Sequence, residues 1–179
     1  CILVENVLRT MQEMAAFHRR QFDIPVLGIT GTNGKTTTKE LIAAVLSKSY
    51  EVTATKANFN NHIGVPLSLL SINDKTEIAV IEMGASAPGE IARLAQIAQP
   101  TCGIVTNVGK AHLLGFGSFE GVKKAKGELY DYLRQKGGVA FYNADNQYLS
   151  EMINNRHGLP VRKYGVHFQE AEVFNPTFE

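Results

Sequence analysis

Apolar residues recur along the chain in two alternating patterns. Residues 24–30, Ile-Pro-Val-Leu-Gly-Ile-Thr, form a short apolar run, which is typical of a buried strand. Residues 36–47 then have helical spacing of their apolar side chains, at Leu41, Ile42, Val45 and Leu46. The same alternation predicts, in order, strand 78–82, helix 88–98, strand 102–107, helix 119–134, strand 138–142, helix 146–155 and strand 161–166.

A further helix is predicted before the first strand. Residues 4–20 also have helical spacing and end in the basic triplet His18-Arg19-Arg20, which suits a helix C-terminus. Helices alternating with strands predict an α/β fold, with a doubly wound, mostly parallel sheet and helices on both faces. A length of 179 residues is enough for one such domain.

Composition narrows the classes of partner. The chain is 44% apolar and 20% charged, and its net charge of +1 gives no field that would attract nucleic acid or an anionic membrane. No run approaches the roughly 18–20 apolar residues of a membrane span, and the first residues lack a basic signal region. We therefore expect a cytoplasmic protein that binds small molecules and has no membrane span.

Residues 30–37, Thr-Gly-Thr-Asn-Gly-Lys-Thr-Thr, join the first predicted strand to the next helix. Glycines in such a loop let backbone N–H groups converge on phosphate oxygens, and the helix N-terminus adds a favourable dipole. Lys35 would reach the β- and γ-phosphates, and the hydroxyl of Thr36 would join the magnesium shell. The usual phosphate-loop spacing places a glycine where this chain has Ile29. Gly-Lys-Thr at a strand-to-helix junction nevertheless predicts nucleotide binding.

Residues 30–37 also resemble the variant phosphate loop of the Mur ligase superfamily, to which the Ile29 departure belongs. Five later segments are similar to the same family: 58–66 (Asn-Phe-Asn-Asn-His-Ile-Gly-Val-Pro), 81–85 (Ile-Glu-Met-Gly-Ala), 111–118 (Ala-His-Leu-Leu-Gly-Phe-Gly-Ser), 125–128 (Ala-Lys-Gly-Glu) and 143–146 (Asn-Ala-Asp-Asn). They look most like the members that join D-alanyl-D-alanine to a UDP-muramyl tripeptide. The resemblance implies that residues 1–179 are the central ATP-binding domain, shortened at its C-terminal side and without the two flanking substrate domains.

The resemblance also implies a set of site residues. ATP would be held by Gly31, Thr32, Asn33, Gly34, Lys35, Thr36 and Thr37. Asn60 and Asn61 would lie near the γ-phosphate, although turn formation alone would explain both. Two magnesium ions would be bound by Thr36, Glu82, His112 and Lys126, and catalysis would use Lys35, His112 and Lys126. Glu82 and His112 follow predicted strands at the carboxyl edge of the sheet, where doubly wound folds bind ligands.

Lys126 lies within an apolar stripe of the helix predicted over residues 119–134. The stripe is formed by Phe119, Val122, Lys126, Leu129 and Leu133. Burial lowers a lysine's pKa, and a neutral amine can react with carbon dioxide. In the family the matching lysine is carbamylated, which would provide an anion for the second magnesium ion. Alternatively, Lys126 extends its stem along the sheet and keeps its charge in water. Lys123 and Lys124 lie outside the stripe and are expected to be solvated.

The resemblance implies a reaction in which ATP phosphorylates a carboxylate and the amine of D-alanyl-D-alanine attacks the resulting acyl phosphate. We expect a monomer. Three alternatives remain open. The chain could belong to a folylpolyglutamate or cyanophycin type of ligase, or to a P-loop kinase or GTPase, although no Asn-Lys-x-Asp guanine motif is present. It could also be a nucleotide-binding module without turnover.

Overall fold

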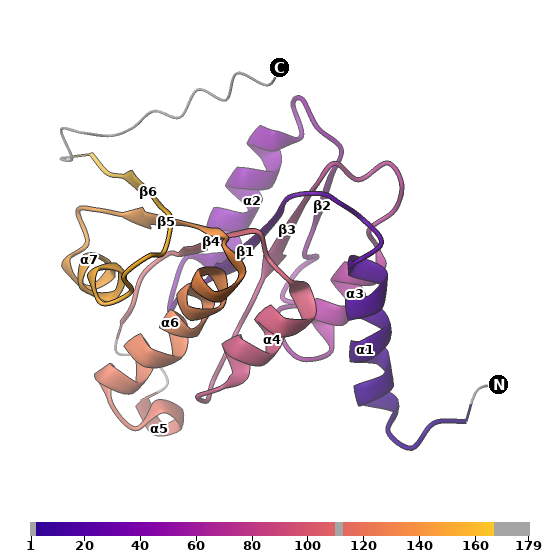
Figure 1. Ribbon diagram of the computed structural model, residues 1–179, viewed down its shortest axis with the longest axis horizontal. Coiled ribbons are helices and arrows are strands. Elements are labelled where there is room, and N and C mark those ends of the chain that lie inside the picture. Colours follow the sequence, from indigo (N-terminus) through magenta and orange to yellow (C-terminus); the bar gives the residue numbers. More distant parts are fainter. Residues whose placement is uncertain (1–2, 110–112, 167–179) are drawn as a thin grey trace.

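The computed structural model describes residues 3–109 and 113–166, which contain a single six-stranded sheet in the order β2-β3-β1-β4-β5-β6 (Figure 1). Every neighbouring pair of strands is parallel. The strands are β1 (Val26–Thr30), β2 (Val52–Ala54), β3 (Ile78–Glu82), β4 (Cys102–Val105), β5 (Val139–Asn143) and β6 (Val161–Tyr164). The chain leaving β1 turns toward β2, whereas the chain leaving the adjacent β4 turns toward β5. This reversal defines the position at the carboxyl edge where doubly wound sheets bind ligands.

Helices cover both faces of this sheet. They are α1 (Val7–Arg19), α2 (Lys35–Leu46), α3 (Gly64–Leu70), α4 (Glu90–Ala98), α5 (Leu113–Phe116), α6 (Phe119–Lys136) and α7 (Gln147–Asn154). Successive residues of a strand point to opposite faces of the sheet and pack into two separate cores. Ile29, Val80 and Ile104 pack with α2, whereas the larger core on the opposite face includes residues of α1, α3, α4, α6 and α7. Among the described helices, α2 is thus the one that covers the face of the sheet that carries Ile29.

The predicted doubly wound parallel sheet is confirmed, and the ten predicted helices and strands are present. The strand predicted over 78–82 has the predicted bounds, and the other nine elements have shifted ends. Three short elements, β2, α3 and α5, were not predicted. They have three, seven and four residues, which is too short for a periodic pattern to stand out. No helix within the described residues is both long and apolar enough to cross a membrane.

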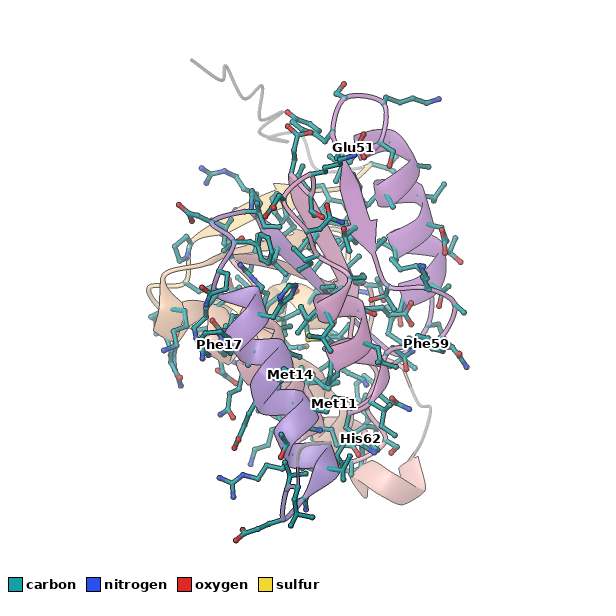
Figure 2. All side chains as sticks on the ribbon, turned by 90° about the vertical axis from the view of Figure 1, so that its right-hand side faces the viewer. Met11, Met14, Phe17, Glu51, Phe59 and His62 are labelled. Carbon is teal, nitrogen blue, oxygen red and sulfur yellow. The ribbon has the colours of Figure 1, made fainter. Side chains whose placement is uncertain are left out.

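Helix α1 is shorter than the predicted helix 4–20 because the side chain of Asn6 caps it, accepting a hydrogen bond from the backbone N–H of Arg9. Its burial also differs from the apolar pattern. The buried residues are Gln12, Ala15 and Arg19, whereas Met14 and Phe17 are exposed on its outer side (Figure 2). The helix packs on α3 and α4 through the face that carries these small and polar residues.

Candidate nucleotide-binding site

The glycine loop begins where β1 ends and leads directly into α2, which starts at Lys35. Gly34 is the N-cap residue, with φ of 76°, and Gly31 has φ of 145°. Both values favour glycine. A Cβ atom on Gly31 would also collide with the hydroxyl oxygen of Thr106. Ile29, which departs from the usual phosphate-loop spacing, is wholly buried in the core beneath α2.

A second loop, after β4, holds the glycine loop in place. Thr106 and Asn107 donate side-chain hydrogen bonds to the carbonyl oxygen of Asn33 at 2.7 and 3.0 Å. The backbone N–H groups of Thr32 and Asn33 donate in turn to the backbone and side-chain oxygens of Asn107, each at 3.0 Å. The hydroxyl of Thr32 accepts from the backbone N–H of Gly109 at 2.9 Å. The loop's shape is thus set by contacts that its own sequence does not reveal.

Lys35 folds back over the loop. Its ammonium donates to the carbonyl oxygens of Gly31 and Thr32 at 2.9 and 3.0 Å. Burial lowers the pKa of Lys35 from its ordinary value, and the carboxylate of Glu82 partly opposes this effect. The cation and the carboxylate are therefore close enough to interact.

Glu82, the last residue of β3, is wholly buried. One carboxylate oxygen accepts hydrogen bonds from the hydroxyl of Thr36 at 3.2 Å and the amide of Asn60 at 2.7 Å. Its other carboxylate oxygen has no hydrogen-bond partner among the residues that the structure describes. A buried carboxylate with an unpaired oxygen beside a hydroxyl suits a hard cation such as magnesium, which takes oxygen ligands. The predicted pair Thr36 and Glu82 is thus brought together.

Lys126 occupies the apolar stripe as predicted, since only 3% of it is exposed and the stripe residues Val122, Leu129 and Leu133 are wholly buried. Its ammonium donates to the carbonyl oxygen of Ala85 at 3.2 Å and lies 5.2 Å from the centre of the Phe116 ring. The alternative with the charge in water is therefore wrong.

The electrostatic surroundings of Lys126 place it near the glycine loop. Burial lowers its pKa to about 8, and the positive charge of Lys35 contributes to this shift. The carboxylates of Glu128 and Glu90 act in the opposite direction. Lys35 is therefore within electrostatic reach of both Glu82 and Lys126.

The expectation that Lys123 is solvated is wrong. Only 9% of it is exposed, and its ammonium pairs with the carboxylates of Glu120 and Glu151 at 2.8 and 3.1 Å. It also lies within 6 Å of two aromatic ring centres, those of Phe119 and Tyr148. Packing of α7 against α6 supplies Glu151 and Tyr148, which the pattern of α6 alone does not predict.

The two asparagines differ in their contacts. Asn60 reaches Glu82, whereas the side-chain oxygen of Asn61 accepts from the backbone N–H groups of Ile63 and Gly64 at 3.0 and 2.9 Å. Asn61 thus forms the turn that leads into α3, in agreement with its interpretation as a turn residue. His112 lies outside the described residues, and within those residues no group of three or more His, Cys, Asp or Glu side chains is placed to hold a metal.

Glu128 is a residue near the site whose contacts sequence reasoning missed. Its carboxylate accepts from the backbone N–H groups of Gly89 and Ala92 at 2.7 and 2.9 Å. This caps the first turn of α4 and ties it to α6, the helix that carries Lys126. The feature of the sequence that could have pointed to Glu128 is its place in segment 125–128, which resembles the family, two residues after Lys126.

A hollow of about 580 Å³ opens beside the loop, with room for a second ligand next to Lys35. The loop that carries His62 lies against α1 (Figure 2), where the side-chain amide of Gln12 donates to the carbonyl oxygen of His62 at 2.8 Å. The hollow is lined by Leu8, Lys35, Asn60, Asn61, His62, Gly84, Ala85, Ser86, Glu90, Arg93 and Leu94.

The fold, the glycine loop and the buried carboxylate define a nucleotide-binding domain of the Mur type. The model of the Mur ligase middle domain matches residues 29–176, and the chain belongs to this family. It is 42% identical over 164 residues to the UDP-N-acetylmuramoyl-tripeptide–D-alanyl-D-alanine ligase of Bacillus subtilis, covering 92% of this chain and 35% of that relative. The ligase of the same name from Synechocystis is 48% identical over 149 residues, covering 83% and 33%. The chain thus spans about a third of these relatives.

Solved structures agree with this assignment. The crystal structure of MurF from Acinetobacter baumannii matches with a TM-score of 0.85 and 32% identity, covering 92% of this chain and 36% of that one. MurF from Thermotoga maritima, solved in complex with ADP, matches with a TM-score of 0.83 and 35% identity, covering 92% and 38%. FolC of Escherichia coli has a TM-score of 0.63 at 13% identity, with coverage of 90% and 47%, and therefore shares the fold.

Proposed function

We propose that this chain is the ATP- and magnesium-binding part of a ligase that joins D-alanyl-D-alanine to UDP-N-acetylmuramoyl-tripeptide. The names of the relatives, at 42% and 48% identity, support the substrates. The observation that carries the nucleotide and metal assignment is the buried carboxylate of Glu82 beside the hydroxyl of Thr36, directly after a glycine loop.

The triphosphate would lie over the glycine loop at the start of α2. The N–H groups of Thr32 and Asn33 are already used within the protein, so those of Gly34 to Thr37 would face the phosphates. Lys35 would exchange its two carbonyl contacts for phosphate oxygens, while Gly31 allows the close approach of the loop to Thr106. The remaining loop residues, Thr32 and Asn33, then act through the shape they give the loop.

Thr36 and Glu82 would hold one magnesium ion, with Asn60 orienting the carboxylate. His112 and a carbamylated Lys126 would hold the second. With a pKa of about 8, about a tenth of Lys126 is neutral at pH 7. The neutral amine attacks the carbon of carbon dioxide, one C=O π bond opens, and the amine releases a proton to water, which leaves a carbamate anion. When bound, the metal ions neutralise the charge of the transferring phosphoryl group.

In the proposed reaction the terminal carboxylate of the tripeptide lies in the hollow beside Lys35. The carboxylate oxygen attacks the γ-phosphorus, the bond to the β-γ bridging oxygen breaks, and ADP leaves. The amine of D-alanyl-D-alanine then attacks the acyl carbon, the carbon–oxygen bond to phosphate breaks, and the proton that the amine loses passes to water. Lys35 reduces repulsion between the two anions. Because the relatives are about three times as long, we assign nucleotide binding to this chain and turnover to the longer ligase.

Titration of the 179-residue chain with ATP and magnesium, followed by calorimetry and thermal melting, tests the nucleotide assignment. We expect binding that stabilises the fold, by about 2.7 kcal/mol at a ligand concentration 100 times the Kd. Lys35→Ala should weaken binding by about tenfold or more, because a charge-assisted hydrogen bond contributes about 1.5–3 kcal/mol. Lys48→Ala, an exposed lysine beyond the same helix, is the control. Absence of any shift at millimolar ATP contradicts the assignment.

Mass spectrometry of the intact chain in bicarbonate buffer tests the modification of Lys126. The expected result is a labile mass increase of one carbon dioxide that is absent from Lys126→Met. An unmodified chain under these conditions, with ATP and magnesium bound, contradicts the carbamate and leaves the nucleotide assignment intact.

A further inference from the structure

Helix α2 carries a buried lysine one turn after Lys35. Lys39 has an exposed fraction of 0%, although lysine is among the residue types least often buried without a partner. Its ammonium donates to the carbonyl oxygen of Thr55 at 2.6 Å and to that of Ala57 at 3.4 Å, and pairs with the exposed carboxylate of Glu40 at 2.8 Å. Two of its contacts thus go to the backbone between β2 and α3.

That backbone segment, residues 55–60, holds Glu82 from two sides. The hydroxyl of Thr55 accepts a hydrogen bond from the backbone N–H of Glu82 at 3.0 Å, and the amide of Asn60 donates to its carboxylate at 2.7 Å. The carbonyl oxygen of Asn60 also accepts from the backbone N–H of Gly84 at 2.7 Å. The position of the Glu82 carboxylate therefore depends on the path of the segment.

The segment includes a backbone conformation that is unfavourable for its residue type. Ala57 has φ of 46°, in the left-handed region that L side chains rarely adopt. Its carbonyl oxygen is one of the two backbone acceptors of Lys39. Lys39 therefore holds the chain on both sides of the exposed residue Lys56, at Thr55 and at the strained Ala57.

We propose that Lys39 is a positioning residue for the magnesium site: its ammonium fixes the backbone at Thr55 and Ala57, and through Thr55 and Asn60 it orients the carboxylate of Glu82. This inference rests on the proposed magnesium- and ATP-binding function. Lys39 does not contact the nucleotide in this arrangement, because its wholly buried ammonium already donates to protein oxygens. Loss of a group that hydrogen-bonds directly to a metal ligand typically lowers metal affinity by about 10–100-fold. Thr55 and Asn60 are such groups for Glu82, and Lys39 acts through the segment that carries them.

The test measures the Kd of the 179-residue chain for ATP with magnesium and with EDTA. The ratio of the two values gives the gain in affinity that magnesium provides. Lys39→Met keeps the apolar stem but removes the ammonium, and we expect it to reduce this gain by about tenfold or more. ATP affinity in EDTA should stay within about twofold of wild type, because the glycine loop and Lys35 are unchanged. Lys48→Ala, in the turn after α2, should leave both values unchanged.

Two results overturn the proposal: an unchanged magnesium gain in Lys39→Met, or an equal loss of affinity with and without magnesium, which indicates a general loss of structure. Failure of the wild type to bind ATP with magnesium counts against the proposed function instead. Thr55→Val provides a second test if Lys39→Met does not fold by circular dichroism. This substitution removes only the hydroxyl that accepts a hydrogen bond from the backbone N–H of Glu82. We expect it to reduce the gain in ATP affinity that magnesium provides. A gain equal to that of the wild type overturns the proposal.

Discussion

Helices α2 and α6 each carry a buried lysine near the candidate site, but they are built in opposite ways. In α6 the apolar stripe is the buried face, and Lys126 lies within it beside Val122 and Leu129. In α2 two of the four apolar residues at helical spacing are on the outside: Leu41 is 63% exposed and Val45 is 70% exposed. The residue that α2 buries completely is Lys39.

The difference follows from what surrounds each helix. Helix α6 packs against α4, α7 and the sheet, and strand glycines let it approach closely. A Cβ atom on Gly103 would lie 3.0 Å from a methyl carbon of Leu129. Helix α2 is the one described helix on its face of the sheet, and of its residues Ile42 and Leu46 join the apolar core there. We infer that α6 depends mainly on apolar packing, whereas α2 depends more on polar contacts to the loops around it.

Among substitutions that leave the fold intact, truncation of the apolar face of α6 should have the largest effect on stability. Leu129→Ala should lower the free energy of unfolding by about 2–5 kcal/mol, because it leaves a cavity at a wholly buried position. Leu41→Ala in α2 is the matched control and should change it by less than about 0.5 kcal/mol. Urea denaturation of the two variants measures this contrast. Equal losses would show that α2 is packed as tightly as α6.

Replacement of the buried lysine in α6 should have a smaller, pH-dependent effect. The folded-state pKa of Lys126 is about 8, against an ordinary value of 10.5, so both states bind its proton below pH 8 and the burial penalty is then complete. Between pH 8 and 10.5 the unfolded chain binds more protons, and this group's contribution to stability rises with pH. In buffer free of carbon dioxide, Lys126→Met should be more stable than wild type by about 1–3 kcal/mol at pH 7.

This stability difference should narrow as the pH rises from 8 to 10.5, and thermal melting at half-unit steps measures it. Lys124→Met, at an exposed position two residues earlier in the helix, controls for general effects of charge removal. A difference that stays constant across this pH range would contradict the assigned burial penalty.

Removal of the side-chain cap of α6 should cost less. The hydroxyl of Ser118 accepts from the backbone N–H of Gly121 at 3.0 Å, whereas the N-cap residue of α2 is Gly34, which provides no side-chain cap. Ser118→Ala should therefore lower the free energy of unfolding by about 1 kcal/mol in denaturation experiments. Ser118→Asp, which preserves a capping oxygen, should retain stability. A loss of stability in both variants would assign the effect to something other than the cap.

The smallest effect is expected at the outer face of α2. Val45→Lys should change the free energy of unfolding by less than about 0.5 kcal/mol, because the side chain is largely solvated already. The matching substitution in α6, Leu133→Lys, would place a charge at a wholly buried position and should prevent normal folding. Circular dichroism and thermal melting of the two variants test the expected contrast between an exposed position of α2 and a buried position of α6.

Local sequence patterns were sufficient to predict much of the fold of this protein. The strand run before the glycine loop, the helix after it and the stripe of α6 with Lys126 were all predicted from spacing, because burial on a sheet imposes a period on the residues that face it. The resemblance of residues 30–37 to the Mur phosphate loop selected the family that the comparison found. The roles of the predicted site residues in ligand binding, those of His112 and Asn61 included, stay predictions.

Patterns failed where a contact comes from a distant segment. Lys123 was expected in water, but α7 supplies the carboxylate of Glu151 that pairs with it. The burial of Lys39 was not predicted. No residue near it in the sequence indicates that the carbonyl oxygen of Thr55, 16 residues away, accepts a hydrogen bond from its ammonium. A buried charge needs a partner, and no local spacing specifies one that is remote.

The sequence by itself determined the order of elements, the glycine loop and the residue types available for phosphate and magnesium, since these depend on local periodicity and on side-chain chemistry. The tertiary structure decided which of those residues meet. It brought Thr36 and Asn60 onto the carboxylate of Glu82, pinned the glycine loop through Asn107, and buried Lys39 beneath the segment that carries Asn60. These contacts join residues 16 to 74 positions apart, which meet because the parallel strands of the sheet end at one edge.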